Sequence, residues 1–221
     1  MRKAVVLLSG GLDSATTLYD AQSKGFQCHC LIFDYHQRHR REIKSAGALA
    51  QKAGCSYSIV KINLPWKGSA LLDTTMALPK DQSLTRQGIP PTYVPARNII
   101  FLSFAASCAE AIGARNIFIG TNAIDYSGYP DCRPEFMRSF QVMLAKGLKT
   151  GIEKKTIHLR TPLIRKTKAQ IVKLAVRLKV PLELTWSCYK GGAQPCGACD
   201  SCRFRAKGFS EAQIKDPAFK I

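Results

Sequence analysis

The sequence is short of acidic side chains: 15 aspartates and glutamates stand against 33 lysines and arginines, so the formal net charge is +18. It also lacks any apolar run near the roughly 20 residues that a helix needs to cross a bilayer, which argues against a membrane-spanning protein. It contains no internal repeat and no low-complexity segment. The positive charge favours attraction to polyanions such as nucleotides or tRNA, and a solvated basic face is the alternative.

Export signals are also missing from the start of the chain. Met1-Arg2-Lys3 leads directly into an apolar stretch, without the small-residue cleavage site of a signal peptide. The nine cysteines, an odd number, then favour metal binding and free thiols over disulfides. We therefore expect a cytoplasmic protein that makes no membrane contact.

A glycine pair follows the first apolar run, within the segment Ser9-Gly10-Gly11-Leu12-Asp13-Ser14. It lies between a predicted buried strand at residues 4–8 and apolar spacing typical of a helix at residues 15–19. Glycines let the backbone approach a ligand closely, and the start of the helix offers free N–H groups to an anion. The Walker loop is excluded because no lysine follows its last glycine. The segment favours a phosphate site in which Asp13 meets a metal-bridged phosphate; an ordinary strand-to-helix turn is the alternative.

Strands and helices alternate along most of the chain. Further strands are expected at residues 28–33, 56–61, 116–120 and 156–159, and further helices from about 36 to 52, 97 to 112, 134 to 149 and 167 to 178. This order predicts an α/β fold over residues 1–180, with a parallel five-stranded sheet and helices on both faces. Residues 64–96 carry five prolines and no periodicity, so we expect a lid-like connection there.

Four cysteines gather near the end of the chain with the spacing C-x7-C-x2-C-x2-C. They are Cys188, Cys196, Cys199 and Cys202. Four thiolates without a histidine suit a closed tetrahedral zinc site that is structural, because no coordination position stays open for water. An iron–sulfur cluster is the alternative, since C-x2-C-x2-C also occurs in ferredoxin-like sites. Residues 181–221 are therefore predicted to form a small zinc-binding subdomain.

Several segments together carry a resemblance to a known family. They are residues 9–14, Phe33-Asp34-Tyr35 with Gln37-Arg38-His39-Arg40, Val94-Pro95-Ala96-Arg97-Asn98, Asp125 to Arg133, Thr161-Pro162-Leu163, Lys168 and the four cysteines. The first segment alone resembles the PP-loop of N-type ATP pyrophosphatases. The whole set resembles the 7-cyano-7-deazaguanine synthase family of queuosine biosynthesis, over nearly the entire chain. Ala96 departs from this pattern, because the family often has glycine there.

The resemblance implies an adenine nucleotide α-hydrolase-like fold and an ATP-dependent carbon–nitrogen ligase. Such an enzyme converts 7-carboxy-7-deazaguanine and ammonia to the 7-cyano product through adenylated intermediates, with Mg²⁺ beside ATP. The resemblance also implies a homodimer that acts on small molecules, with no direct binding of nucleic acid. Two alternatives stay open: a PP-loop adenylase that modifies tRNA, for example by thiolation, and a zinc-ribbon interaction module fused to an inactive nucleotide fold.

The resemblance and the residue types assign roles within this sequence. The ATP-binding residues are expected to be Leu8, Ser9, Gly10, Gly11, Leu12, Asp13, Ser14, Phe33 and Tyr35. The catalytic residues are expected to be Asp13, Lys168 and Arg97. The substrate-binding residues are expected to be Asp125, Tyr126, Ser127, Tyr129, Asp131 and Arg133. Cys132 lies in the same polar loop, and it is either a catalytic thiol or a packed or ligand-contacting one.

Overall fold

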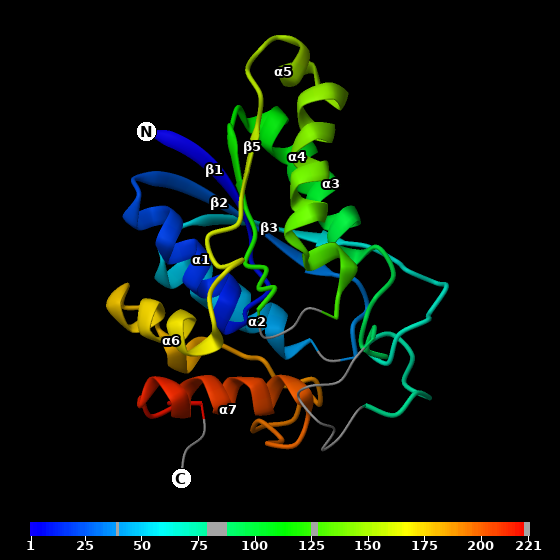
Figure 1. Cartoon of the computed structure of the whole chain (residues 1–221), viewed down its shortest axis with the longest axis vertical. Helices are drawn as coiled ribbons and strands as arrows, with labels where there is room; N and C mark the ends of the chain where they lie inside the picture. Colours follow the sequence, from blue (N-terminus) through cyan, green and yellow to red (C-terminus); the bar gives the residue numbers. More distant parts are fainter. Residues whose placement is uncertain (39, 79–87, 125–127, 219–221) are drawn as a thin grey trace.

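The computed structural model describes residues 1–38, 40–78, 88–124 and 128–218 (Figure 1). Its elements in chain order are β1 (Arg2–Leu7), α1 (Leu12–Ser23), β2 (Phe26–Asp34), α2 (Arg41–Lys52), β3 (Ser56–Lys61), α3 (Arg97–Ile112), β4 (Asn116–Phe118), the 3₁₀ turn η1 (Pro130–Cys132), α4 (Pro134–Gly147), α5 (Lys149–Ile152), β5 (His158–Arg160), α6 (Lys168–Arg177), the 3₁₀ turn η2 (Leu182–Leu184) and α7 (Asp200–Ala212).

The five strands form one parallel sheet in the order β3-β2-β1-β4-β5. The α/β fold with a parallel five-stranded sheet is thereby confirmed. The chain builds outwards from β1 to β3, and then returns to the other side of β1 to place β4. In such sheets ligands bind outside the carboxyl ends of the strands at the point where the order reverses. That point here lies between β1 and β4.

Both faces of the sheet are covered by helices, as expected. Successive side chains of a strand point to opposite faces, so β1 contributes Ala4 and Val6 to one buried cluster and Val5 and Leu7 to the other. The first cluster packs against α1, α2, α6 and α7, and the second against α3 and α4 (Figure 1). Among the described residues, no helix has the length and apolar character needed to span a membrane.

Helix α2 begins at Arg41, so the prediction that it opens at His36 is wrong. His36 has a φ of +59°, which a helix does not allow. The side chain of Gln37 accepts a hydrogen bond from the Tyr35 backbone N–H at 2.9 Å and donates to the Phe33 carbonyl at 3.2 Å. These bonds fold the segment after β2 into a tight turn and delay the helix.

The cysteine-rich tail contains a 13-residue helix, α7, that the sequence patterns did not predict. Its residues Phe209 and Ala212 are buried in the same cluster as α1 and α6, so the tail packs on the sheet's helical layer. The division of the chain at residue 180 stays a prediction.

The connection at residues 64–96 is firmly attached at both of its described ends. Ser69, Ala70 and Thr92 are fully buried, and the Ala70 N–H donates to the Pro91 carbonyl at 2.8 Å. The Arg38 guanidinium donates to the Met76 carbonyl at 3.0 Å. Residues 79–87 lie outside the described residues, and a lid role for the segment stays a prediction.

Helix α3 is flanked by left-handed residues at both ends. Ala96 precedes it with a φ of +56°, and Gly113 follows it with a φ of +70°. This conformation brings the Cβ of alanine close to a backbone carbonyl, at a cost of roughly 1–2 kcal/mol, whereas glycine adopts it freely. The departure from the family pattern at Ala96 therefore falls where the backbone favours glycine.

We expect Ala96→Gly to raise the free energy of unfolding by ~0.5–1 kcal/mol, because relief of the left-handed strain exceeds the added freedom of the unfolded chain. Urea denaturation measures this change. The matched control is Gly113→Ala, where nothing lies within 4 Å of an added Cβ and only the backbone conformation is tested. The free energy of unfolding of Gly113→Ala should fall by about 1 kcal/mol. A fall for Ala96→Gly as well would contradict the expected relief of strain at residue 96.

Candidate active site

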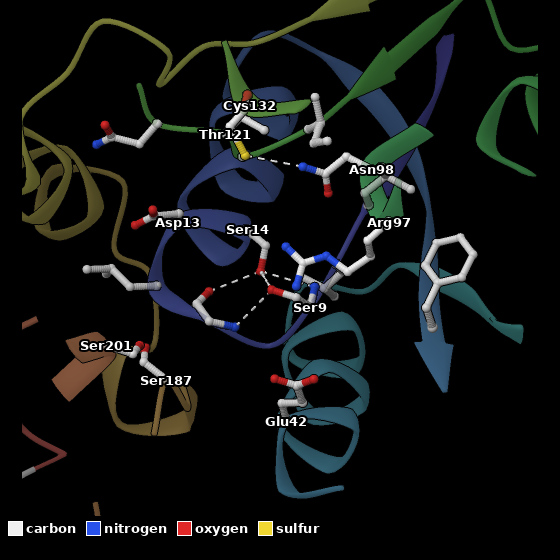
Figure 2. A pocket seen from close by; sticks show the side chains of 18 of the residues that line it. Ser9, Asp13, Ser14, Glu42, Arg97, Asn98, Thr121, Cys132, Ser187 and Ser201 are labelled. Atoms are coloured by element: carbon white, nitrogen blue, oxygen red, sulfur yellow. Dashed lines mark hydrogen bonds between the residues drawn. The ribbon is translucent and has the colours of Figure 1, made fainter. Parts of the chain in front are cut away.

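A cavity of about 330 Å³ opens at the reversal of strand order. The segments that follow β1 and β4 line it from two sides, through Ser9, Asp13 and Ser14 on one side and Gly120 and Thr121 on the other. Figure 2 shows the side chains of Ser9, Asp13, Ser14 and Thr121 around one space. The Thr121 hydroxyl is buried and finds no hydrogen-bond partner among the described residues.

The loop after β1 is held in shape by its own hydroxyl groups. Ser14 Oγ donates to the Gly11 carbonyl at 3.1 Å and accepts from the Ser9 N–H at 3.2 Å, and the two serine hydroxyls lie 3.0 Å apart. Gly11 is the N-cap of α1, and no described side chain caps that helix start. The first N–H groups of α1 are thus presented beside two hydroxyls, which is an arrangement that binds phosphate.

Gly10 has a different role from its neighbours, because it does not line the cavity. Its φ is +86°, and a Cβ there would collide with the Glu42 carbonyl of α2 and approach Ala46 N to 2.9 Å. Its own carbonyl accepts the Trp186 N–H at 2.8 Å. Glycine at this position therefore allows close contact between the loop, α2 and the cysteine-rich tail.

Lys168 and Asp13 form an ion pair inside the cavity. The lysine Nζ lies 2.8 Å from Asp13 Oδ1 and 2.7 Å from Oδ2. Lys168 is the first residue of α6, and α7 covers it through Gly208, where a Cβ would collide with the lysine side chain. The absence of a side chain at Gly208 thus leaves the space in which Lys168 reaches the loop.

Arg97 supplies a second cation on the opposite wall. Its guanidinium carbon lies 5.9 Å from the centroid of the Tyr129 ring. Burial lowers the pKa of Arg97, but Tyr35, Tyr129, Cys132 and Asp131 outweigh this and raise it, so the group stays charged. Burial raises the pKa of the nearby Tyr35 hydroxyl to about 12. The wall therefore combines a fixed positive charge with the neutral phenol of Tyr35.

Cys132 faces the cavity, but it is poorly suited to be a nucleophile. Burial, followed by the charge of Asp131, raises the pKa of its thiol to about 12. Its sulfur accepts a hydrogen bond from Asn98 Nδ2 at 3.2 Å. The neutral thiol supports a packing or ligand-contacting role, because the thiolate is the reactive form.

Asp131 lies at the start of α3, where its Oδ2 accepts the Asn98 backbone N–H at 3.0 Å. The carboxylate satisfies one of the free N–H groups of that helix and carries a charge that its dipole favours. Asp131 and Arg133 are not among the residues that line the cavity, whereas Tyr129 is. Asp125, Tyr126 and Ser127 lie outside the described residues. Substrate contacts of this loop stay a prediction.

The other predicted site residues are brought together. Those that line the cavity are Leu8, Ser9, Gly11, Leu12, Asp13, Ser14, Phe33, Tyr35, Arg97 and Lys168. Phe33 already stacks on Phe101, with ring centroids 4.0 Å apart and planes within 7° of parallel. One face of Phe33 is therefore occupied by the protein.

Glu42 is a cavity residue that sequence reasoning missed. It lies in the first turn of α2 and lines the cavity. Burial raises the pKa of Glu42 to about 7, against the opposing effects of a hydrogen bond from Gln37 and the charge of Arg97. The signal in the sequence was an acidic residue just after the Gln37 to Arg40 segment that carried part of the resemblance.

The four cysteines of the tail form a compact cluster. Their sulfur atoms all lie within 4.8 Å of one another, and Cys196 and Cys202 are 4.0 Å apart. Tetrahedral coordination with metal–sulfur bonds of about 2.3 Å requires sulfur atoms about 3.8 Å apart, so the cluster fits a metal ion. The N–H groups of Lys190 and Cys196 donate to Cys188 Sγ at 3.4 and 3.3 Å, which stabilises a thiolate.

The cluster also holds one wall of the cavity. Trp186, Ser187 and Tyr189 surround the first cysteine of the cluster and line the cavity. Arg41 of α2 stacks its guanidinium 3.9 Å from the centroid of the Trp186 ring and donates to the Gly192 carbonyl at 2.8 Å. The tail is thereby fastened to α2 next to the loop after β1.

Comparison with known proteins identifies the family. The family model described as "Queuosine biosynthesis protein QueC" matches residues 3–213. The chain belongs to this family. Proteins named 7-cyano-7-deazaguanine synthase are 52% identical in Nostoc sp. (97% of this chain, 96% of that protein), 52% identical in Thermoplasma volcanium (98% and 90%) and 48% identical in Cellvibrio japonicus (98% and 96%). The resemblance found in the sequence is thus confirmed.

Solved structures of lower identity share the fold of this QueC family member. The NMN synthetase from Francisella tularensis is 14% identical, with a TM-score of 0.51 over 96% of this chain and 77% of that one. A predicted subunit of a tRNA methyltransferase from Methanocaldococcus jannaschii is 14% identical, with a TM-score of 0.52 over 100% of this chain and 93% of that one. At this identity the likeness concerns the fold alone.

We expect Cys199→Ser to lower the free energy of unfolding by more than ~3 kcal/mol, because metal coordination contributes directly to folding in such clusters. A chelator should lower the stability of the unsubstituted protein in the same way, and thermal unfolding measures both effects. Cys108→Ser, in α3 and outside the cluster, is the matched control and should change stability little. If the Cys199→Ser variant and the chelator-treated protein both melt at the temperature of the untreated, unsubstituted protein, a metal role for the cluster is contradicted.

Proposed function

We propose that this chain is an ATP-dependent ligase that converts 7-carboxy-7-deazaguanine and ammonia to 7-cyano-7-deazaguanine in queuosine biosynthesis. The observation that carries the proposal is the cavity at the strand-order reversal, where the phosphate-binding loop, Lys168 and Arg97 meet. Relatives about 50% identical over almost the whole chain bear the corresponding name. A carboxylate is a poor electrophile, so ATP is required to turn its oxygen into a leaving group.

The loop residues would hold ATP by its phosphates. Ser9, Ser14 and the N–H groups at the start of α1 receive the departing pyrophosphate, while Lys168 and Arg97 neutralise the charge that develops on the phosphates. Asp13 offers carboxylate oxygen, the ligand type that Mg²⁺ prefers, beside this loop. Magnesium, when bound, screens the phosphate charge. Lys168 then has phosphate oxygens as alternative partners to Asp13.

The carboxyl group attacks the α-phosphorus, pyrophosphate leaves, and an acyl-adenylate forms. Ammonia displaces AMP to give an amide, and adenylation of the amide oxygen allows its dehydration to the nitrile. The described part of the acceptor site consists of Tyr129, Cys132 and Asn98, beside Arg97. Contacts from Asp131 and Arg133 would require the segment after Gly128 to shift, because the Asp131 carboxylate is bound to α3.

A tRNA-modifying adenylase with the same loop is not favoured, because the family match covers nearly the full chain and the named relatives are 7-cyano-7-deazaguanine synthases. The expected homodimer, the absence of nucleic-acid binding and the cytoplasmic location stay predictions. The net charge of +18 favours attraction to polyanions such as tRNA. A tRNA affinity that falls steeply with salt concentration would indicate contacts to phosphates.

Incubation of the protein with ATP, Mg²⁺, ammonium and 7-carboxy-7-deazaguanine should yield the amide and then the nitrile, detected by mass spectrometry. ATP–pyrophosphate exchange should depend on the 7-carboxy substrate. Lys168→Met should slow this exchange about 100-fold, because removal of one such charge from the transition state costs about 3 kcal/mol. Lys173→Met, on the exposed face of the same helix, is the matched control. Absence of both products with the unsubstituted protein would refute the proposal.

The metal in the cysteine cluster is proposed to be zinc. Four cysteine sulfur atoms that all lie within 4.8 Å of one another, with no histidine among the ligands, suit a closed structural site. Elemental analysis of protein purified in air should give about one zinc per chain. Bound iron together with a brown colour would replace this assignment with an iron–sulfur cluster.

A further inference from the structure

Two carboxylates line the cavity among the described residues, and their partners differ. Asp13 contacts Lys168 through both oxygens. Glu42 accepts a hydrogen bond from the neutral amide of Gln37, Nε2 to Oε1, at 2.9 Å, and no ion pair to it forms within the described parts of the chain. The Asp13 carboxylate is therefore already paired with a cation, whereas the Glu42 carboxylate is not.

Glu42 is a partly exposed residue whose carboxyl group is surrounded largely by protein atoms. Gly10 packs against its backbone, and among the described residues Tyr35, just after β2, and Arg97 of α3 are the titratable groups that face its side chain. Figure 2 shows the Glu42 carboxylate and the Arg97 guanidinium directed toward the part of the cavity next to Ser9. The carboxylate thus lies beside the loop expected to hold ATP, and it can exchange a proton with a ligand bound there.

The proposed reaction requires a proton acceptor, and a role for Glu42 in proton transfer rests on that reaction. As the nitrogen lone pair attacks the acyl carbon, the C–O bond to the adenylate breaks and its electron pair leaves with AMP, while one N–H proton must depart. Adenylation of the amide oxygen gives an imidate and releases one of the two amide N–H protons. In the nitrile-forming step, the remaining N–H proton leaves, the N–H electron pair becomes the third C–N bond, and AMP departs with the C–O pair. Each step releases one proton from nitrogen.

We propose that the Glu42 carboxylate is the group that accepts these protons from nitrogen. The other cavity groups are poor proton acceptors, because Lys168 and Arg97 are cations and Asp13 is paired with Lys168. Burial raises the pKa values of Tyr35 and Cys132 to about 12, so both remain protonated near neutral pH. The Glu42 carboxyl group, with its pKa raised by burial to about 7, is basic enough to take a proton and acidic enough to release it.

Glu42→Gln tests the proposal, because glutamine keeps the shape and the hydrogen bond from Gln37 but accepts no proton. We expect substrate-dependent ATP–pyrophosphate exchange to remain within about threefold of the unsubstituted enzyme. Amide and nitrile formation should fall about 100-fold, the usual contribution of a general base. Glu42→Asp, which retains the acid, should recover part of the loss. Glu110→Gln, whose carboxylate binds the Thr150 N–H away from the cavity, is the matched control.

The pH profile separates proton transfer from a structural role. The charged form of Glu42 is the acceptor, so the turnover number of the unsubstituted enzyme should rise with pH through about 7, measured at constant free ammonia and saturating ATP. The Glu42→Gln enzyme should lack this rise. An unchanged profile and product rate would overturn the proposal, as would a raised KM for ATP at unchanged turnover, which would assign Glu42 to nucleotide binding.

The stability of the Glu42→Gln protein at pH 8 separates a loss of activity from a loss of folding. A carboxyl whose folded pKa lies above its ordinary value of 4.5 favours folding in its protonated form, so its contribution is lost as pH rises from 4.5 through about 7. At pH 8 the Glu42→Gln protein should therefore be at least as stable as the unsubstituted one. If the unsubstituted enzyme itself shows no substrate-dependent exchange, the proposed function fails; if it makes nitrile and the variant does so equally well, only the Glu42 assignment fails.

Discussion

The contact of the Gly10 backbone with its neighbours is the constraint on which the rest of the site depends. On one side it lies against α2, with no room for a side chain, and on the other its carbonyl accepts the Trp186 N–H. Three parts of the chain that are far apart in sequence meet there: the phosphate-binding loop, the helix that carries Glu42 and the start of the cysteine-rich tail. A shift of this backbone would therefore move the loop, the carboxylate and the cavity wall together.

The tail is fastened to the domain at several independent points. The cysteine cluster closes the segment on itself, Arg41 holds it against α2, and Arg205 forms a buried ion pair with Asp216 at 2.6 Å while donating to Thr185. Breaking such a buried pair leaves an uncompensated charge, which is costly. Because Trp186 and Ser187 form part of the cavity wall, a metal ion bound by the four cysteines would act on the site by holding this wall in position.

The parts of the structure set by local sequence were predictable, and those set by long-range packing were not. Short apolar or β-rich stretches marked all five strands, and the glycine pair and the C-x2-C steps marked the loop after β1 and the cysteine cluster. The strand order, which places β4 beside β1, depends on how helices pack on the sheet. For the same reason the contact between Gly208 and Lys168 and the capping of α3 by Asp131 left no local pattern. Helix α7 was missed because its N-cap, Cys199, and a residue of its first turn, Cys202, belong to the cysteine cluster.

The difference between the two cavity carboxylates follows from what packs around each of them. Asp13 sits at the start of α1, where Lys168 from α6 reaches it because α7 leaves a gap at Gly208. Glu42 sits at the start of α2, where its backbone carbonyl packs against Gly10 and its carboxylate accepts a hydrogen bond from the amide of Gln37. A carboxylate bound to a cation serves to hold charge, whereas a desolvated one near neutrality serves to move protons. In the proposed reaction, one cavity would thereby hold both the phosphates and the acceptor of the proton that leaves nitrogen.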